Sequence, residues 1–330
     1  MRLPQQYEAR WFEEGDMDAY IEGLNRSLYY DYSERLFSWK FWDNPCSLGF
    51  PTIAVVEHTP TGRPVAFNSF LPMEVRRGDD LFAVLQGCDG FVDEAHRRQG
   101  LFQMTLNFMM EEMRGRSPEI LLGFNLVEAA GAARKAGSVY AHDVDRCSLD
   151  RSAFESLRGK SGVTLEPLDT ATLNGLYEEW ASRSPLFHIH RSIPYISWYN
   201  KNPLRRFKTY TVHMRGGYAG YLVVDEVEEG GQLILTLEDY PPGMLGGDLL
   251  RGVVARLCDV NPDAAVMDVY MQRGDPLEQD LSILGFSVAP WFKVIMKALN
   301  NVVQERDSVI RKGVELSDLT RWHITAGDIY

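Results

Sequence analysis

A short polar hinge, Arg97-Arg98-Gln99-Gly100, joins two segments with different apolar patterns. Residues 81–91 are mostly apolar and predict a strand, whereas the apolar residues after the hinge recur at helical spacing. A strand that leads into a helix exposes backbone N–H groups at the helix start, where the helix dipole is positive. Two guanidinium groups and a glycine at this place therefore predict a binding site for an anionic group such as a phosphate. The helical apolar positions are Phe102, Leu106, Met109, Met110 and Met113.

The spacing of the hinge differs from two common nucleotide-binding motifs, GxxxxGK[ST] and GxGxxG. It resembles instead the acyl-CoA pyrophosphate loop of the GNAT acyltransferase superfamily, whose motif is Arg/Gln-x-x-Gly-x-Gly/Ala. Arg97 matches the first position of this motif and Gly100 matches the central glycine. Phe102 departs from the small residue at the last position, as it does in one branch of the family. The alternative is that the two arginines are ordinary surface residues before a helix.

Two further segments resemble the same family. LLGFN at residues 121–125 is similar to the strand that splays from its neighbour to admit the pantetheine arm, and RKAGSV at residues 134–139 is similar to the segment that ends the core domain. The resemblance implies that the chain binds an acyl-CoA, with acetyl-CoA as the expected cosubstrate. The residues that it implies for this contact are Phe91, Val92, Arg97, Arg98, Gln99, Gly100, Leu101, Phe102 and Asn125.

The chain contains a repeat. Residues 36–45 (LFSWKFWDNP) and 195–203 (YISWYNKNP) share a Ser-Trp pair followed by Asn-Pro. Each copy has a helix before it, then two strands, a helix, a strand, a helix and a final strand. With the resemblance, this order predicts an α/β (α+β) fold of two tandem GNAT-like domains, each a mixed, mostly antiparallel sheet flanked by helices. We expect one domain at 1–155, a degenerate one at 160–300, and a tail at 301–330.

The second copy lacks the cationic hinge. Its counterpart, residues 235–254, contains two prolines, which have no backbone donor, and Asp248, which we expect to N-cap the following helix. Glu238 and Asp239 would repel a pyrophosphate. We therefore expect only the first domain to bind CoA, while the second walls the substrate pocket.

Acyl transfer to an amine requires a base for the ammonium proton, donors for the thioester carbonyl and an acid for the leaving thiolate. The resemblance places the base on the strand before the loop, where Asp89 is the only acid; a solvent-facing Asp is the alternative. Duplicated members of the family imply a second base, the terminal carboxylate of Tyr330, unless that terminus is frayed. Ala133 replaces the tyrosine that commonly protonates the thiolate, so water or Tyr140 would supply this proton.

The net charge and the cysteine pattern limit which partners and which cellular compartment we expect. The formal net charge of −12 argues against a nucleic-acid partner, because phosphate binding needs an excess of Lys and Arg. Four scattered cysteines without CxxC spacing indicate neither a zinc cluster nor a disulfide framework, and we expect a reducing cytoplasm. No apolar run is long enough to cross a bilayer. His188 and His190 have a spacing that could bind a metal, but no partner ligand is evident and we expect no metal.

The predicted function is N-acyltransfer from acetyl-CoA to a small amine, such as an amino sugar or an amino-acid derivative, by a monomer or homodimer. A direct ternary complex is favoured, because no Cys or Ser lies in a nucleophile motif. A Fem-type aminoacyl transferase, which takes a tRNA-carried donor, is the enzymatic alternative. A catalytically dead CoA-sensing or partner-binding module is the non-enzymatic alternative.

Overall fold

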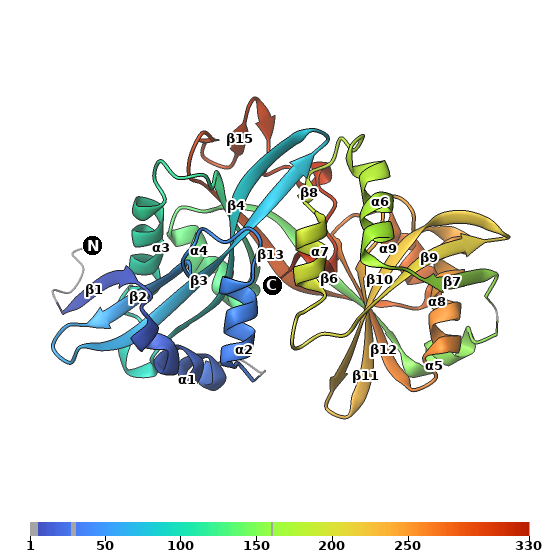
Figure 1. The fold of residues 1–330 in the computed structure, drawn as a ribbon, viewed down its shortest axis with the longest axis horizontal. Helices are drawn as coiled ribbons and strands as arrows, with labels where there is room; N and C mark the ends of the chain where they lie inside the picture. Colours follow the sequence, from blue (N-terminus) through green and yellow to red (C-terminus); the bar gives the residue numbers. More distant parts are fainter. Residues whose placement is uncertain (1–5, 28–30, 160, 330) are drawn as a thin grey trace.

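A computed structural model of the chain describes residues 6–27, 31–159 and 161–329. Two halves lie side by side and share one continuous sheet (Figure 1). The described strands form a 13-stranded sheet in the order β1-β2-β3-β4-β5-β13-β6-β12-β11-β10-β9-β7, with β8 paired to β3. Most neighbours are antiparallel, and the mixed, helix-flanked sheet confirms the predicted fold class.

The first half follows the predicted order of elements. The two strands predicted after the first Ser-Trp motif form a hairpin, whose turn is residues 59–62. The elements are β1 (Tyr7–Trp11), α1 (Met17–Ser27), α2 (Glu34–Phe37), a π-helical turn (Ser38–Trp42), β2 (Ile53–His58), β3 (Arg63–Arg77), β4 (Asp80–Val92), α3 (Leu101–Glu112), β5 (Ile120–Leu126), α4 (Val127–Lys135), β6 (Val139–Asp150) and α5 (Arg151–Ser156).

The second half repeats this order. Asp169 N-caps the first of its long helices by accepting a hydrogen bond from the N–H of Thr172. The elements are β7 (Val163–Pro167), α6 (Thr170–Ala181), β8 (His188–Ile189), α7 (Ile193–Tyr199), β9 (Phe207–Met214), β10 (Gly217–Glu229), β11 (Gln232–Asp239), α8 (Gly247–Val260), β12 (Ala264–Gln272), α9 (Leu277–Leu284) and β13 (Ser287–Ala298).

The halves exchange their last strands. β6 belongs to the first repeat but pairs with β12 of the second, and β13 of the second repeat pairs with β5 of the first. β6 and β13 also pair with each other, antiparallel, at the centre of the sheet. The boundaries expected at 155 and 160 describe the repeat in the sequence, whereas each half of the sheet is completed by a strand from the other repeat.

Helices cover both faces of the shared sheet. The largest apolar cluster lies on one face and combines side chains of α1 and α2 with those of α6 and α7. The opposite face is covered by α3 in the first half and by α5, α8 and α9 in the second. Because the first cluster spans both repeats, the two halves share a hydrophobic core.

The tryptophans of the repeated motif meet at this shared core. The rings of Trp39 and Trp198 stack with their centroids 4.7 Å apart and their planes at 6°. Trp39 Nε1 donates to the carbonyl oxygen of Trp198 at 2.8 Å, and Trp198 Nε1 donates to that of Trp39 at 2.6 Å. The contact is reciprocal, as expected where two copies of one motif face each other across a pseudo-twofold axis.

We expect Trp198→Phe to destabilise the protein by about 1–3 kcal/mol, because it leaves the buried carbonyl of Trp39 without this donor. Urea unfolding followed by fluorescence measures the change. Trp42→Phe is the matched control, since Trp42 is 53% exposed. Equal stability of the two variants would contradict a structural role for the paired indoles.

The tail has structure of its own. It contains the small sheet β14 (Val303–Gln304), β15 (Val309–Arg311) and β16 (Val314–Glu315). Arg311 is buried, forms ion pairs with Asp80 and Glu119, and lies over the ring of Phe82. The tail is therefore anchored to the end of the β3–β4 hairpin.

Candidate active site

The strands β4 and β5 form a fork. They pair in parallel from Val84–Ile120 to Gly87–Gly123 and then separate, while β4 continues to Val92. The backbone of β4 beyond Gly87 therefore has no pairing with β5. A cavity of about 150 Å³ at the fork is lined by residues of β3, β4, β5, α3, α4 and β13. An elongated ligand could thus enter the sheet here.

The predicted hinge, residues 97–100, lies between the end of β4 and the start of α3. Gly100 precedes α3 with φ of 83°, and no side chain caps the helix. Arg98 also has a positive φ, 61°, which is uncommon for a residue with a side chain. The first N–H groups of α3 have no partner within the helix, so they are available to an anion.

Most of the predicted CoA residues line one of two cavities. Val92, Arg97, Arg98, Gly100 and Leu101 line a second cavity at the start of α3, and Asn125 lines the cavity at the fork. Phe102 lines both cavities, so the two adjoin each other.

Two predicted residues point elsewhere. Oε1 of Gln99 accepts a hydrogen bond from the hydroxyl of Tyr7 at 3.0 Å, and Gln99 does not line the cavity at the start of α3. The ring of Phe91 packs against Phe67, 5.1 Å between centroids, on the face of the sheet that α1 covers. A methyl group on Gly23 of α1 would overlap this ring. The ring of Phe91 thus packs between β3 and α1, next to the fork.

Asp89 lies in a buried ion pair. Its Oδ2 is 2.6 Å from Nζ of Lys40, and both residues are at most 6% exposed. Burial opposes the charge on Lys40, but the carboxylate of Asp89 outweighs this effect and the pKa of Lys40 is raised. The expected alternative of a solvent-facing Asp89 is therefore wrong. Sequence reasoning missed Lys40, although a lysine between the aromatic residues Trp39 and Phe41 was a visible signal of burial.

Three more side chains bear on the chemistry at the fork. Cys88 lines the cavity, and burial raises the pKa of its thiol to about 12, so it is no ready nucleophile. Ala133 lines the same cavity, where the resemblance implied a tyrosine in other proteins. Tyr140, the alternative acid, does not line the cavity in the part of the chain that is described, and burial raises the pKa of its hydroxyl to about 12.

The corresponding helix start in the second repeat is occupied by a carboxylate. The N-cap of α8 is Gly246, and the N–H of Gly247 donates to Oδ2 of Asp280 at 2.8 Å. The prediction that Asp248 caps this helix is wrong, because Asp248 lies in the first turn with an exposed side chain. Asp280 reaches the site from α9 and has the effect that was expected of Asp248.

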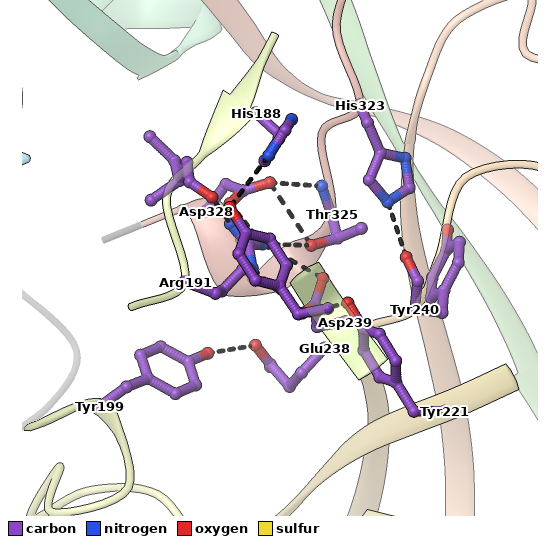
Figure 2. A network of polar contacts seen from close by, with 12 residues as sticks. His188, Arg191, Tyr199, Tyr221, Glu238, Asp239, Tyr240, His323, Thr325 and Asp328 are labelled. Carbon is purple, nitrogen blue, oxygen red and sulfur yellow. Dashed lines mark hydrogen bonds and ion pairs between the residues drawn. The ribbon is translucent and has the colours of Figure 1, made fainter. Parts of the chain in front are cut away.

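The C-terminal segment covers the end of β11 (Figure 2). Arg191 is buried between Asp239 of β11, at 3.0 Å, and Asp328 of the tail, at 2.6 Å. His323 contacts the carbonyl of Tyr240 through Nε2, and Gln272 of β12 donates to the carbonyl of Trp322. Residues 322–328 of the C-terminal segment thus cover the end of the β11–β12 pair. Tyr330, the second predicted base, lies outside the described residues.

His188 and His190 both contact the hydroxyl of Tyr177, at 3.0 and 3.1 Å. Among the described residues, no group of three His, Cys, Asp or Glu side chains could hold a metal ion. Burial lowers the pKa of His188 to about 3 and that of His190 to about 4, with nearby arginines adding to the effect. The two imidazoles are therefore neutral parts of a buried polar network.

This network predicts a loss of stability in acid. Because the folded pKa of His188 lies below the unfolded value near 6.5, the unfolded chain takes up the proton first as the pH falls. The contribution of His188 is full above pH 6.5 and decreases by about 1.4 kcal/mol per pH unit below it, down to about pH 3. Urea unfolding at pH 7.5, 6 and 5 should give a smaller pH slope for His188→Gln than for the wild type. Equal slopes would contradict this assignment.

Comparison with known proteins identifies the fold. No protein-family model and no curated protein matches the chain. A GCN5-related N-acetyltransferase from Anabaena variabilis superposes with a TM-score of 0.65 and 13% identity, over 89% of this chain and 73% of that one. One from Kribbella flavida gives 0.61 and 13%, over 89% and 71%. The Saccharomyces cerevisiae N-myristoyltransferase, solved with bound myristoyl-CoA, gives 0.59 and 12%, over 90% and 83%.

The chain has the fold of the GCN5-related N-acetyltransferases, here as two repeats in one sheet. This confirms the resemblance that the hinge indicated, at the level of the fold. The likeness extends over both halves, since about nine-tenths of the chain is covered.

Proposed function

We propose that the protein transfers an acyl group from acetyl-CoA to a small amine, such as an amino sugar or an amino-acid derivative. The observation that carries this proposal is a pair of adjoining cavities, one at the uncapped, cationic start of α3 and one at the fork between β4 and β5, which share Phe102. A helix start with free N–H groups suits a pyrophosphate, and a fork without strand pairing suits a pantetheine arm.

The residues present fit a bound CoA. Arg97 and Arg98 and the first N–H groups of α3 would hold the pyrophosphate. Asn125 would face the pantetheine arm, and a backbone N–H of β4 near Phe91 or Val92 would donate to the thioester carbonyl. The matching helix start in the second repeat already has its N–H bound to Asp280, which supports one CoA site per chain.

A short acyl group is supported by the packing beside the fork. On the α1 face, Phe91 contacts Phe67 and lies against Gly23, and the neighbouring aromatic rings of Tyr20 and Phe37 are fully buried. A long acyl chain directed to this face would have to displace well-packed rings, which is unfavourable. An acetyl group requires no such rearrangement.

The proposed reaction is direct. The neutral amine forms a bond to the thioester carbonyl carbon, the C–S bond breaks, and CoA leaves as the thiolate and takes up a proton. The ammonium proton passes to a base, for which we propose Asp89 or the terminal carboxylate of Tyr330. Ala133 lines the fork, and Tyr140 is not among the described residues that line it, so we propose that water supplies the proton of the thiolate.

We also propose a cellular compartment, an oligomeric state and a range of partners. Among the described residues no helix is long and apolar enough to cross a membrane. We propose a cytoplasmic monomer or homodimer without a nucleic-acid partner or metal, on the charge and cysteine pattern of the sequence. A Fem-type aminoacyl transferase is less favoured, because the cationic hinge fits free CoA and the net charge disfavours tRNA.

Release of free CoA from acetyl-CoA, measured with a thiol reagent over a panel of amines, tests the function. We expect amine-dependent release with mass-spectrometric detection of the acetylated amine. Binding of CoA without turnover on any amine would favour the CoA-sensing alternative. Absence of both CoA binding and turnover would contradict the proposed site.

A further inference from the structure

A further cavity lies in the second repeat, beside the C-terminal segment. It has a volume of about 450 Å³ and shares no lining residue with the two cavities of the proposed CoA site. Residues 320–324 of the tail contribute to its wall, together with the ends of β11 and β12 and the start of α9. Leu245, Leu277 and Ile324 form its buried apolar part, and residues 273–276 form an exposed rim. The cavity has the size and the mixed lining of a small-molecule site.

Two buried polar side chains line this cavity with unused hydrogen-bonding atoms. Tyr240 is 5% exposed, and its hydroxyl has no hydrogen-bond partner among the described residues. Gln272 is 8% exposed, and its Nε2 donates to the carbonyl of Trp322 at 2.7 Å, which leaves Oε1 as an acceptor without a partner in the described part of the chain. Neither atom is fully enclosed by the protein, so both are open to the cavity. Because folded proteins seldom leave such buried groups unpaired, the two atoms indicate a polar ligand.

His323 supplies a third acceptor to the same cavity. Its Nε2 lies 2.7 Å from the carbonyl oxygen of Tyr240 (Figure 2). A carbonyl oxygen only accepts, so Nε2 carries the proton of this hydrogen bond. Burial lowers the pKa of the imidazole, so the ring is neutral and Nδ1 is an acceptor.

The charge of the lining is mainly negative. Asp275 and Asp280 both line the cavity, and neither forms an ion pair with any residue that the structure describes. Arg273 is the only Arg or Lys among the described lining residues, and its guanidinium is already bound to Asp143 and Asp145. Burial, and then the charge of Asp275, raise the pKa of the Tyr240 hydroxyl, so one of the unpaired carboxylates acts on an unpaired hydroxyl. Acceptors and negative charge thus exceed donors, which favours a cationic, donating ligand.

We propose that this cavity binds a small organic ammonium ion with an apolar body. The ammonium group donates to the carboxylate of Asp275 at the rim, and Gln272 Oε1 and the hydroxyl oxygen of Tyr240 are further acceptors. The apolar body packs against Leu245 and Leu277. An anion would be repelled by the carboxylates, and a neutral ligand would leave them without a counter-ion. This site goes beyond the proposed acyl transfer and does not depend on it.

Tryptamine and tryptophol test the proposal, because they differ only in an ammonium group and a hydroxyl group. Titration calorimetry without acetyl-CoA excludes acyl transfer. We expect tryptamine to bind about ten-fold or more tightly than tryptophol, and Asp275→Asn to weaken tryptamine about ten-fold. The Tm of Asp275→Asn should not change, because the asparagine oxygen still accepts from the N–H of Leu277. Tyr240→Phe should also keep its Tm and weaken tryptamine about three-fold, since its hydroxyl has no bond within the described chain to lose.

Asp263→Asn is the matched control. It removes an exposed carboxylate of the same repeat that does not line the cavity, so it should leave the affinity for tryptamine unchanged. Asp275→Asn should leave the Kd for CoA unchanged. Equal affinity of Asp275→Asn and the wild type for tryptamine would overturn the proposal, because the amine would then bind elsewhere. Equal binding of tryptophol and tryptamine, or no binding of tryptamine at millimolar concentration, would also overturn it.

Discussion

Arg97→Glu is expected to weaken the binding of CoA on the order of a hundred-fold, because it replaces a charge-assisted contact to the pyrophosphate with a repulsive carboxylate. Arg97 lines the cavity at the start of α3, and its Nε donates to the carbonyl of Val92 at 3.2 Å. The fold should tolerate the change, because this contact is exposed. Isothermal titration calorimetry with CoA measures the loss, which should decrease at high salt.

Asp248→Lys is the control for Arg97→Glu. Asp248 lies in the first turn of α8, the helix of the second repeat that corresponds to α3, and its side chain is 78% exposed. Adding positive charge there should leave CoA affinity unchanged, because Asp280 already occupies the helix start. Similar changes in Kd from the two variants would contradict a binding site confined to the first repeat.

Asp89→Asn is expected to lower turnover about a hundred-fold or more while leaving the Kd for CoA unchanged. The amide keeps the shape of the carboxylate but cannot accept the ammonium proton. The residual rate should rise with pH, as more of the amine arrives already neutral. Steady-state kinetics from pH 6.5 to 9.5, with folding verified by the thermal transition, measures this effect. Normal turnover near pH 7 would assign the base to the terminal carboxylate of Tyr330, which a one-residue extension of the tail then tests.

The second repeat offers a control for Asp89. Asp239 lies at the same irregularity in β11 as Asp89 does in β4, and it pairs with the buried cation Arg191 as Asp89 pairs with Lys40. Removal of the Asp89 carboxylate takes the ion-pair partner from the buried Lys40, which costs about 3–5 kcal/mol. Arg191 keeps its ion pair with Asp328, so Asp239→Asn should reduce stability by less, and without the loss of turnover. Equal losses of turnover would show that Asp89 is a positioning residue.

The fold could be predicted from local patterns because each repeat combines clear helical and strand periods with recognisable turns. The hinge at Gly100 and the hairpin of β2 and β3 are local features, and the structure has both where the sequence indicates them. The repeated Ser-Trp motif also predicted two copies of one unit. Its tryptophans proved to contact each other, which no spacing in the sequence could show.

The missed features depend on contacts between distant segments. The exchange of β6 and β13 leaves the order of elements unchanged, so no local pattern reveals it. Asp280 reaches the start of α8 from another helix, 33 residues along the chain, and was missed in favour of the nearer Asp248. Lys40 forms its ion pair with Asp89, which lies 49 residues further along the chain. Tertiary packing determines which side chains a charged residue contacts, whereas the sequence shows only which residues are adjacent to it along the chain.

The stoichiometry of CoA binding shows whether the first repeat alone holds a CoA site. Titration calorimetry of the full chain with CoA should give one site per chain, which Arg97→Glu weakens and Asp248→Lys leaves intact. The single site follows from the free helix start of α3 and the occupied helix start of α8. Two sites per chain, or no binding of CoA at millimolar concentration, would contradict a single CoA site in the first repeat.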